Sequence, residues 1–288
     1  MHPAPEPGLP RTVWMLWLQG EAQAPWLVQR CISSWREQNP NWRVRVLSNQ
    51  DLPLLQPAGL APECWQRLSM QKQANLARLH LLLNHGGVWA DATTLCRVPL
   101  DTWIQEHSCQ GFFAFANPGP DRLLSNWFLA ATPNHPLCQA WLDEQIAYFQ
   151  RQRAIRSKTL LQRALFRGLE RIGRRNCRSS QLWFLPGIGR LTGHSEPYFI
   201  SHYCFSRCLT QHPELRRRWQ GVPKLSAQEA HQAKRACQRQ LTSLEQHQQL
   251  EQLLSSSTPV YKLCWKTLQG SDTDSNLVSA LVRATSQR

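Results

Sequence analysis

The chain contains no long apolar run: no stretch approaches the roughly 20 residues that a helix needs to span a bilayer. The Pro-rich opening, residues 1–7, also lacks the basic-then-apolar layout of a secretory signal. Internal repeats are absent as well, so the sequence does not indicate a repeat architecture. These absences lead us to expect a cytoplasmic protein without a membrane span.

Acidic residues are scarce: 19 Asp and Glu oppose 33 Lys and Arg, a net charge of +14. The excess is concentrated in residues 151–178, where nine arginines and one lysine face a single acid, Glu170. Apolar residues recur there mostly every three to five positions, namely Ile155, Leu160, Leu161, Leu165, Phe166, Leu169 and Ile172. This spacing predicts an amphipathic helix with a basic face. Such a helix can lie peripherally on the anionic inner membrane or meet an acidic partner, or it can be scaffold with a solvated basic face. A basic surface also attracts nucleic acid, although no specific nucleic acid is expected.

The ten cysteines are scattered through the predicted helices and strands. Only Cys204 and Cys208 lie close enough to pair locally, and their spacing inside a helix is poor geometry for zinc. We therefore expect buried free thiols in a reducing compartment.

A chain of 288 residues can bury a full core, and we expect Pro-rich disorder over 1–11 and a single domain over 12–288. The first part alternates strand and helix patterns: strands at 13–19, 43–47, 88–91 and 112–116, helices at 25–38 and 69–84. That order predicts an α/β fold with a mostly parallel sheet and helices on both faces. Beyond Pro118 the pattern is mainly helical, at 136–150, 198–209 and 226–254, before a strand or edge segment at 260–265. We expect a nucleotide-binding half at 12–117 and a helical closing half at 118–288, which also meets the acceptor.

One short segment carries the strongest functional signal. Gly86 and Gly87 end a predicted helix, residues 88–90 form a short apolar strand, and Asp91 follows, with Ala-Thr-Thr after it. Ligands of open α/β sheets bind at the carboxyl ends of strands. Hard oxygen donors there suit Mg²⁺ or Mn²⁺ carrying a diphosphate, although an aspartate in this position is also often a helix cap.

This segment resembles the block SD-x-x-R … YGG-x-(Y/W)-x-D-x-(D/T) of sugar-nucleotide glycosyltransferases with the GT-A fold. The whole chain resembles the capsular polysaccharide synthesis protein family of bacteria, which is related to DXD-containing mannosyltransferases and glucosylating toxins. Further landmarks that fit are Trp14 to Gly20, Ser34-Trp35, Asn39-Pro40, Pro99-Leu100-Asp101, Ser125 to Phe128, His135-Pro136, His202-Tyr203 and Tyr261 to Lys266. The resemblance implies a GT-A-like fold and a metal-dependent, hexosyltransferase-like enzyme. It would move a sugar from a UDP- or GDP-sugar to a surface or capsular polysaccharide, with lipid-linked glycans among the candidate acceptors.

The resemblance also implies roles for individual residues near the glycine pair. Asp91 would be catalytic and hold Mn²⁺ or Mg²⁺, with Thr93 standing where relatives often have a second acid. His202 would complete the metal shell. Asn75 and Arg78, three residues apart on one helix face, would contact the donor sugar and phosphate, and Arg78 would take part in catalysis.

Four further residues are candidates for donor binding. Trp17 matches the aromatic residue that stacks on the donor base, and Trp89 would line the pocket. Lys262 and Lys266 would clamp the diphosphate as point charges. For each candidate an ordinary structural role is the alternative: a core tryptophan or histidine, a surface arginine, or an edge-strand lysine.

A second class of function competes with the enzyme. The missing second acid and the many arginines fit a non-catalytic relative that binds polyanionic glycan or nucleic acid. Presence of Arg78, the glycine pair and Asp91 as a set favours the glycosyltransferase.

Overall fold

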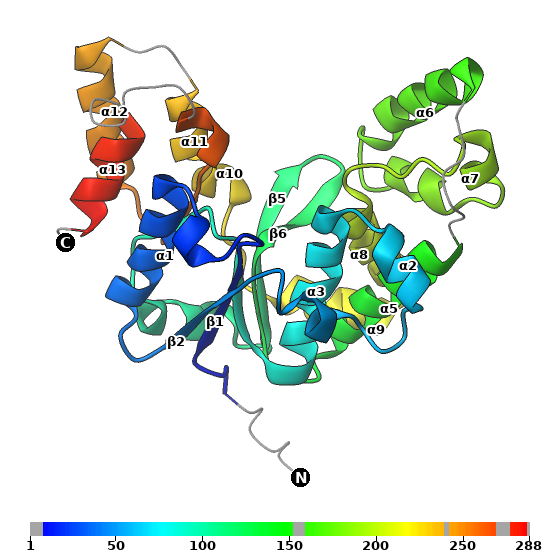
Figure 1. Cartoon of the computed structure of the whole chain (residues 1–288), viewed down its shortest axis with the longest axis horizontal. Coiled ribbons are helices and arrows are strands. Elements are labelled where there is room, and N and C mark those ends of the chain that lie inside the picture. Colours follow the sequence, from blue (N-terminus) through cyan, green and yellow to red (C-terminus); the bar gives the residue numbers. More distant parts are fainter. Residues whose placement is uncertain (1–7, 152–158, 239–241, 269–276, 287–288) are drawn as a thin grey trace.

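The computed structural model describes residues 8–151, 159–238, 242–268 and 277–286. Its central sheet has the strand order β2-β1-β3-β6-β5. The bounds are β1 Thr12–Leu16, β2 Arg43–Leu47, β3 Gly87–Ala90, β5 Phe112–Gly119 and β6 Arg122–Ala131. Figure 1 shows this sheet at the centre, with helices on both faces. The predicted α/β class is thereby confirmed.

The sheet is parallel on one side and antiparallel on the other. Strand β1 runs parallel to both β2 and β3, whereas β6 pairs antiparallel with β3 and β5. The expectation of mainly helical structure beyond Pro118 missed β6, which lies between β3 and β5. Strand β6 inserts there because its apolar side chains pair with β3, with Leu129 opposite Trp89.

Helices cover the two faces unequally, and most of them follow β6. The longer ones are α1 Trp26–Gln38, α3 Met70–His85, α5 Pro136–Arg151, α6 Leu160–Gly173, α8 Ile200–Gln211, α9 Pro213–Gly221, α12 Ser243–Ser255 and α13 Leu277–Ser286. The shorter ones are α2 Pro62–Arg67, α4 Ile104–His107, α7 Ile188–Leu191, α10 Ala227–Ala230 and α11 Gln232–Cys237. In Figure 1, α1 lies with α11–α13 on one side of the sheet, and α3, α5 and α8 lie on the other. The helical C-terminal half is confirmed, although the expected helix at 226–254 is divided among α10, α11 and α12.

Short 3-10 helices connect these elements: η1 Glu21–Gln23, η2 Leu52–Leu55, η3 Leu100–Thr102, η4 Ser179–Phe184 and η5 Trp265–Leu268. Within the described ranges, no helix is both long enough and apolar enough to cross a membrane. All ten cysteines are free thiols, and six of them are buried.

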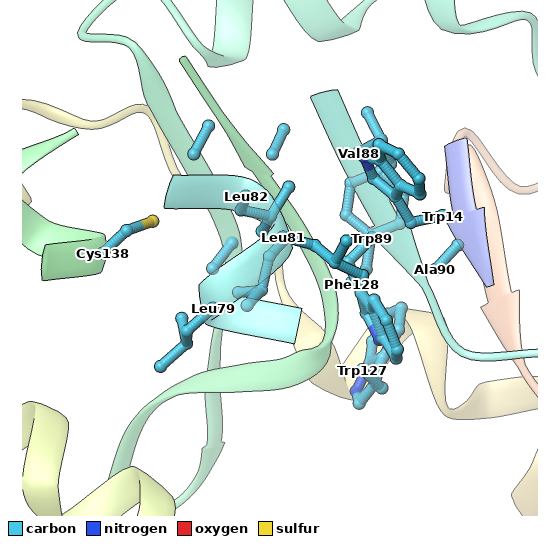
Figure 2. Packing of buried hydrophobic residues seen from close by; sticks show 14 of the residues in the cluster. Trp14, Leu79, Leu81, Leu82, Val88, Trp89, Ala90, Trp127, Phe128 and Cys138 are labelled. Carbon is cyan, nitrogen blue, oxygen red and sulfur yellow. The ribbon is translucent and has the colours of Figure 1, made fainter. Parts of the chain in front are cut away.

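The main core lies on both faces of the sheet. Leu79 and Leu82 of α3 are fully buried, as are Val88 of β3 and Phe128 of β6. Figure 2 shows the two leucines on α3 and the other two side chains in the sheet, where Phe128 stacks on Trp35 of α1. Burying each such side chain contributes about 1.5–3 kcal/mol, so this packing holds the end of β3 in a fixed position.

A second, two-stranded sheet brings the C-terminal part of the chain to the end of β3. Strand β4 (Thr94–Cys96) pairs antiparallel with β7 (Val260–Lys262), and the Leu263 N–H donates to the Thr93 carbonyl at 2.9 Å. Arg97 fixes the approach to β7 by donating to three carbonyls, those of Leu254, Ser256 and Thr258, at 2.6–2.9 Å.

Two expectations fall partly outside the described residues. The Pro-rich disorder at 1–11 includes residues 1–7, and the basic segment 151–178 includes residues 152–158. The remainder of the basic segment forms α6 and the turn after it, as the apolar spacing predicted.

Candidate functional site

The glycine pair shapes the site as the sequence predicted. Helix α3 ends at Gly86, which has a φ of 64° and whose N–H donates to the Leu82 carbonyl at 2.9 Å. Gly87 has a φ of 94°, and a Cβ there would lie 2.5 Å from the Thr12 carbonyl oxygen. Only glycine fits so close to a neighbouring strand. Helix α3 and strand β3 are therefore joined by Gly86 alone, and Asp91 follows Ala90, the last residue of the strand.

The Asp91 carboxylate is bonded by three side chains. Its Oδ1 accepts from Trp89 Nε1 at 3.0 Å and from Arg78 Nη2 at 3.3 Å. Its Oδ2 accepts from Lys262 Nζ at 3.0 Å. Burial alone would raise the pKa of Asp91, but Lys262, Arg78 and the Trp89 bond together lower it below its ordinary value. Asp91 is consequently an ionised carboxylate and a weak base.

Arg78 is buried, so the interpretation as a surface arginine is wrong. Its Nη1 donates to the Asn126 carbonyl at 2.7 Å, and the guanidinium lies 5.2 Å from the centre of the Trp89 ring. Burial lowers the pKa of Arg78, and Asp91 opposes that shift. The guanidinium thus links β6 to the carboxylate at the end of β3 before any ligand binds.

These groups open into a cleft of about 720 Å³, a size typical of small-molecule sites. Seven of the nine predicted site residues line it: Trp17, Asn75, Arg78, Trp89, Asp91, Thr93 and His202. Lys262 reaches Asp91 and Thr93 from β7, and its Nζ lies 2.5 Å from Thr93 Oγ1. Lys266 does not line the cleft, and its ammonium lies 5.9 Å from the ring centre of Trp265. The functional role of each residue remains a prediction.

Two tryptophans form an aromatic wall of the cleft. Trp17 follows β1 and meets the ring of Trp265 edge-on, with centroids 5.9 Å apart. The buried Trp17 Nε1 has no hydrogen-bond partner among the described residues. The Nε1 atoms of Trp103, Trp127 and Trp183 share this feature, so it does not separate a base-stacking role of Trp17 from a core role.

His202 enters the cleft from α8. Burial, with help from Arg122 and Arg78, lowers its pKa to about 3, so the imidazole is neutral. Its buried Nδ1 has no hydrogen-bond partner among the described residues. A neutral imidazole donates from one ring nitrogen and accepts at the other.

The sequence-based reasoning gave no role to several lining residues. Asn126 Nδ2 donates to Asn75 Oδ1 at 3.0 Å, and Lys72 of α3 forms an ion pair with Glu196. Phe166 and Glu170 come from α6. Asn126 and Trp265 stood among the family landmarks, whereas nothing in the sequence pointed to Glu196. The cleft thus draws on both halves of the chain.

The donor set can be tested against the expected Mn²⁺ or Mg²⁺. Among the described residues, no group of three or more His, Cys, Asp or Glu side chains is arranged to hold a metal ion. Asp91 is the single carboxylate of the predicted set of Asp91, Thr93 and His202, and two cations already bond to it. This donor set fits a divalent cation poorly, because such ions prefer several oxygen ligands that carry negative charge. Metal use stays a prediction.

Sequence comparisons identify related proteins. A family model described as "Capsular polysaccharide synthesis protein" matches residues 4–167. O-glycosyltransferase braB of Annulohypoxylon truncatum is 29% identical over 153 residues, which cover 46% of this chain and 36% of that protein. Glycosyltransferase afumC of Aspergillus fumigatus (strain CBS 144.89 / FGSC A1163 / CEA10) is 34% identical over 103 residues, 32% of this chain and 26% of that protein. The matched region thus spans about a third or less of the length of these curated relatives.

Solved structures give distant similarities. PaToxG Glycosyltransferase aligns over 86% of both chains with a TM-score of 0.39 and 15% identity. The UDP-bound glycosyltransferase domain from the YGT toxin aligns over 97% of this chain and 99% of that chain, with a TM-score of 0.38 and 10% identity.

Proposed function

Since the chain belongs to the capsular polysaccharide synthesis protein family, we propose that it is a glycosyltransferase that moves a sugar from a UDP- or GDP-sugar to a surface or capsular glycan. The observation that carries this proposal is the carboxylate at the end of β3. Asp91 and Arg78 line a cleft large enough for a nucleoside diphosphate, and Lys262 bonds to Asp91 from β7.

The proposed reaction makes one bond and breaks one. The bond between the donor's anomeric carbon and the terminal diphosphate oxygen breaks, and its electron pair stays on that oxygen. A hydroxyl oxygen of the acceptor bonds to the anomeric carbon, and its proton passes to the departing diphosphate or to water. Cations fixed beside the leaving group stabilise the charge that develops there, and we assign this role to Lys262, which bonds to Asp91.

Each part of the donor has a matching surface in the cleft. Trp17 and Trp265 offer aromatic faces for the base. The linked amides of Asn75 and Asn126 offer donors and acceptors for sugar hydroxyls. His202 is neutral and adds a further polar contact.

The surface of α6 suggests where the acceptor lies. Leu160 and Leu161 are 82% and 69% exposed, and Leu165 and Ile172 are exposed as well. Arg163, Arg167 and Arg171 are exposed on the same helix. Exposed leucines flanked by arginines are the side chains that anionic lipid surfaces bind. We propose that this α6 surface rests on an anionic membrane, which would hold the cleft beside a lipid-linked acceptor because Phe166 and Glu170 of α6 line it.

Thermal stabilisation by a panel of UDP- and GDP-sugars, with and without Mn²⁺, tests the proposed function. A donor at 100 times its dissociation constant should raise the free energy of unfolding by about 2.7 kcal/mol. Asp91→Asn should abolish the effect, and Asp101→Asn, outside this cleft, should keep it. If no nucleotide stabilises the protein but a polyanionic glycan does, the non-catalytic alternative is correct.

A further inference from the structure

A lysine lies between two of the side chains that the family resemblance assigned to metal binding. The two side chains that the sequence assigned to metal binding after β3 are Asp91 and Thr93. Lys262 Nζ bridges them, at 3.0 Å from Asp91 Oδ2 and 2.5 Å from Thr93 Oγ1. Thr93 accepts this hydrogen bond through a neutral hydroxyl, whereas a second acid would have bound a divalent ion.

The surrounding charge opposes a metal ion at this place. Asp91 carries one negative charge, and Arg78 and Lys262 both pair with it. The other acids that line the cleft are also paired: Glu196 with Lys72 and Glu170 with Arg174. A doubly charged ion beside Asp91 would meet two cations with one carboxylate to offset them.

The position of Lys262 is built into the fold. Strand β7 pairs with β4 so that Lys262 lies opposite Thr94, next to the residue it contacts. The Tyr261 hydroxyl donates to the Leu253 carbonyl at 2.7 Å on the other side of the strand. The lysine side chain is 17% exposed, so it is largely fixed, and the Asp91 and Thr93 side chains that it contacts line the cleft.

We infer that the Lys262 ammonium replaces the divalent cation, so that donor binding and transfer proceed without metal; this rests on the proposed function. An ammonium has three N–H donors. Asp91 and Thr93 take two of them, and the third is available to a phosphate oxygen of the donor. Asp91 and Thr93 then act as positioning residues for the lysine.

Titration of the protein with MnCl₂ alone, followed by electron paramagnetic resonance of free Mn²⁺, tests the site without nucleotide. The wild type should bind no Mn²⁺ at this site. The double variant Thr93→Asp with Lys262→Ala should gain one Mn²⁺ site, because two carboxylates replace the bridge. A wild-type Mn²⁺ site that Asp91→Asn removes would overturn the inference.

Calorimetric titration with UDP and GDP tests the lysine directly. Wild-type affinity should be equal in EDTA and in Mn²⁺. Lys262→Met should weaken binding about 10- to 100-fold, the usual effect of losing a charged hydrogen bond. Lys234→Met, outside the cleft, is the matched control and should bind like the wild type.

The outcomes separate the two proposals. Binding that requires Mn²⁺ would overturn the role of Lys262 and leave the glycosyltransferase standing. Absence of nucleotide binding in both conditions would overturn both proposals. If Lys262→Met does not fold, the wild-type comparison between EDTA and Mn²⁺ decides the question by itself.

Discussion

The cations around Asp91 and the arginines of α6 carry the same charge in opposite surroundings. Arg78 is buried and Lys262 nearly so, and each has a fixed carboxylate partner. On α6 the arginines are exposed, and a described ion pair joins only Arg174 to Glu170. A buried, paired cation has a fixed position and can act on one atom of a ligand. Exposed arginines act together, through the electrostatic potential that their charges add up to.

The most basic segment of the sequence is thus not the place of the candidate site. Most of the basic excess lies in the sequence segment 151–178, yet the cations that bond to Asp91 are Arg78 and Lys262, outside that segment. The following changes separate the two kinds of basic region.

Replacing Asp91 should have the largest effect. Asp91→Asn removes the charge that holds Lys262 and Arg78 in place, so we expect transfer to fall about 10²–10³-fold or more. It should also lower the free energy of unfolding by about 3 kcal/mol, the low end for a broken buried pair, because Asp91 is 28% exposed. Donor turnover and urea unfolding measure the two effects. Wild-type turnover in the folded variant would contradict the assignment.

Replacing the exposed arginines should affect only membrane binding. Changing Arg163, Arg167, Arg171 and Arg175 to Gln should reduce binding to anionic vesicles about 100-fold or more, since each basic side chain contributes about 1 kcal/mol. Arg174 is left in place because it pairs with Glu170 of the cleft. The same four positions changed to Lys should keep binding, and high salt should weaken it. If the wild type does not sediment with anionic vesicles at low salt, α6 is ordinary scaffold.

Trp17 tests whether the cleft wall binds a base. Trp17→Ala should weaken UDP or GDP binding about 10-fold, because stacking contributes about 1–3 kcal/mol per base. Trp17→Phe keeps an aromatic face and should lose less. Trp26→Ala, on the exposed surface of α1, should leave affinity unchanged. If Trp17→Ala lowers the free energy of unfolding but leaves nucleotide affinity unchanged, Trp17 is a core residue.

His202 predicts a smaller, pH-dependent effect. Its folded-state pKa, about 3, lies below the ordinary value of 6.5 because burial disfavours the charged form. The unfolded chain therefore binds the proton first, and stability falls by up to about 1.4 kcal/mol per pH unit as pH drops from about 6.5 toward 3. His202→Gln should reduce this slope and leave the part that His231 contributes, because burial lowers the pKa of His231 to about 4, whereas His247→Gln, exposed on α12, should not change it. Urea unfolding at pH 7, 6, 5 and 4 measures the difference.

Local patterns predicted the part of the site that is local in sequence. The glycine pair, the short strand and Asp91 follow one another within six residues, and backbone sterics at Gly86 and Gly87 leave few alternatives. Seven of the residues named beforehand line one cleft, and their roles stay predictions. The sequence pattern did not determine which ligand these residues bind.

Features that depend on distant pairing were harder to predict. Strand β6 is rich in Leu and Ala, which favour helices, and its neighbours in the sheet override that preference. The contact between Lys262 and Asp91 joins residues 171 positions apart. Only the pairing of β7 with β4 brings them together, and no local spacing encodes it.

Because of the small sheet of β4 and β7, the two charged partners Asp91 and Lys262 come from separate parts of the fold. The carboxylate sits on the large sheet, inside the region that the family model matches, while its cation arrives on a three-residue strand outside that region. Arg97 ties the incoming loop down through three carbonyls, so side-chain changes in that loop need not disturb the anchor. A single substitution in β7 can therefore alter the electrostatics of the cleft while the scaffold that holds Asp91 stays the same.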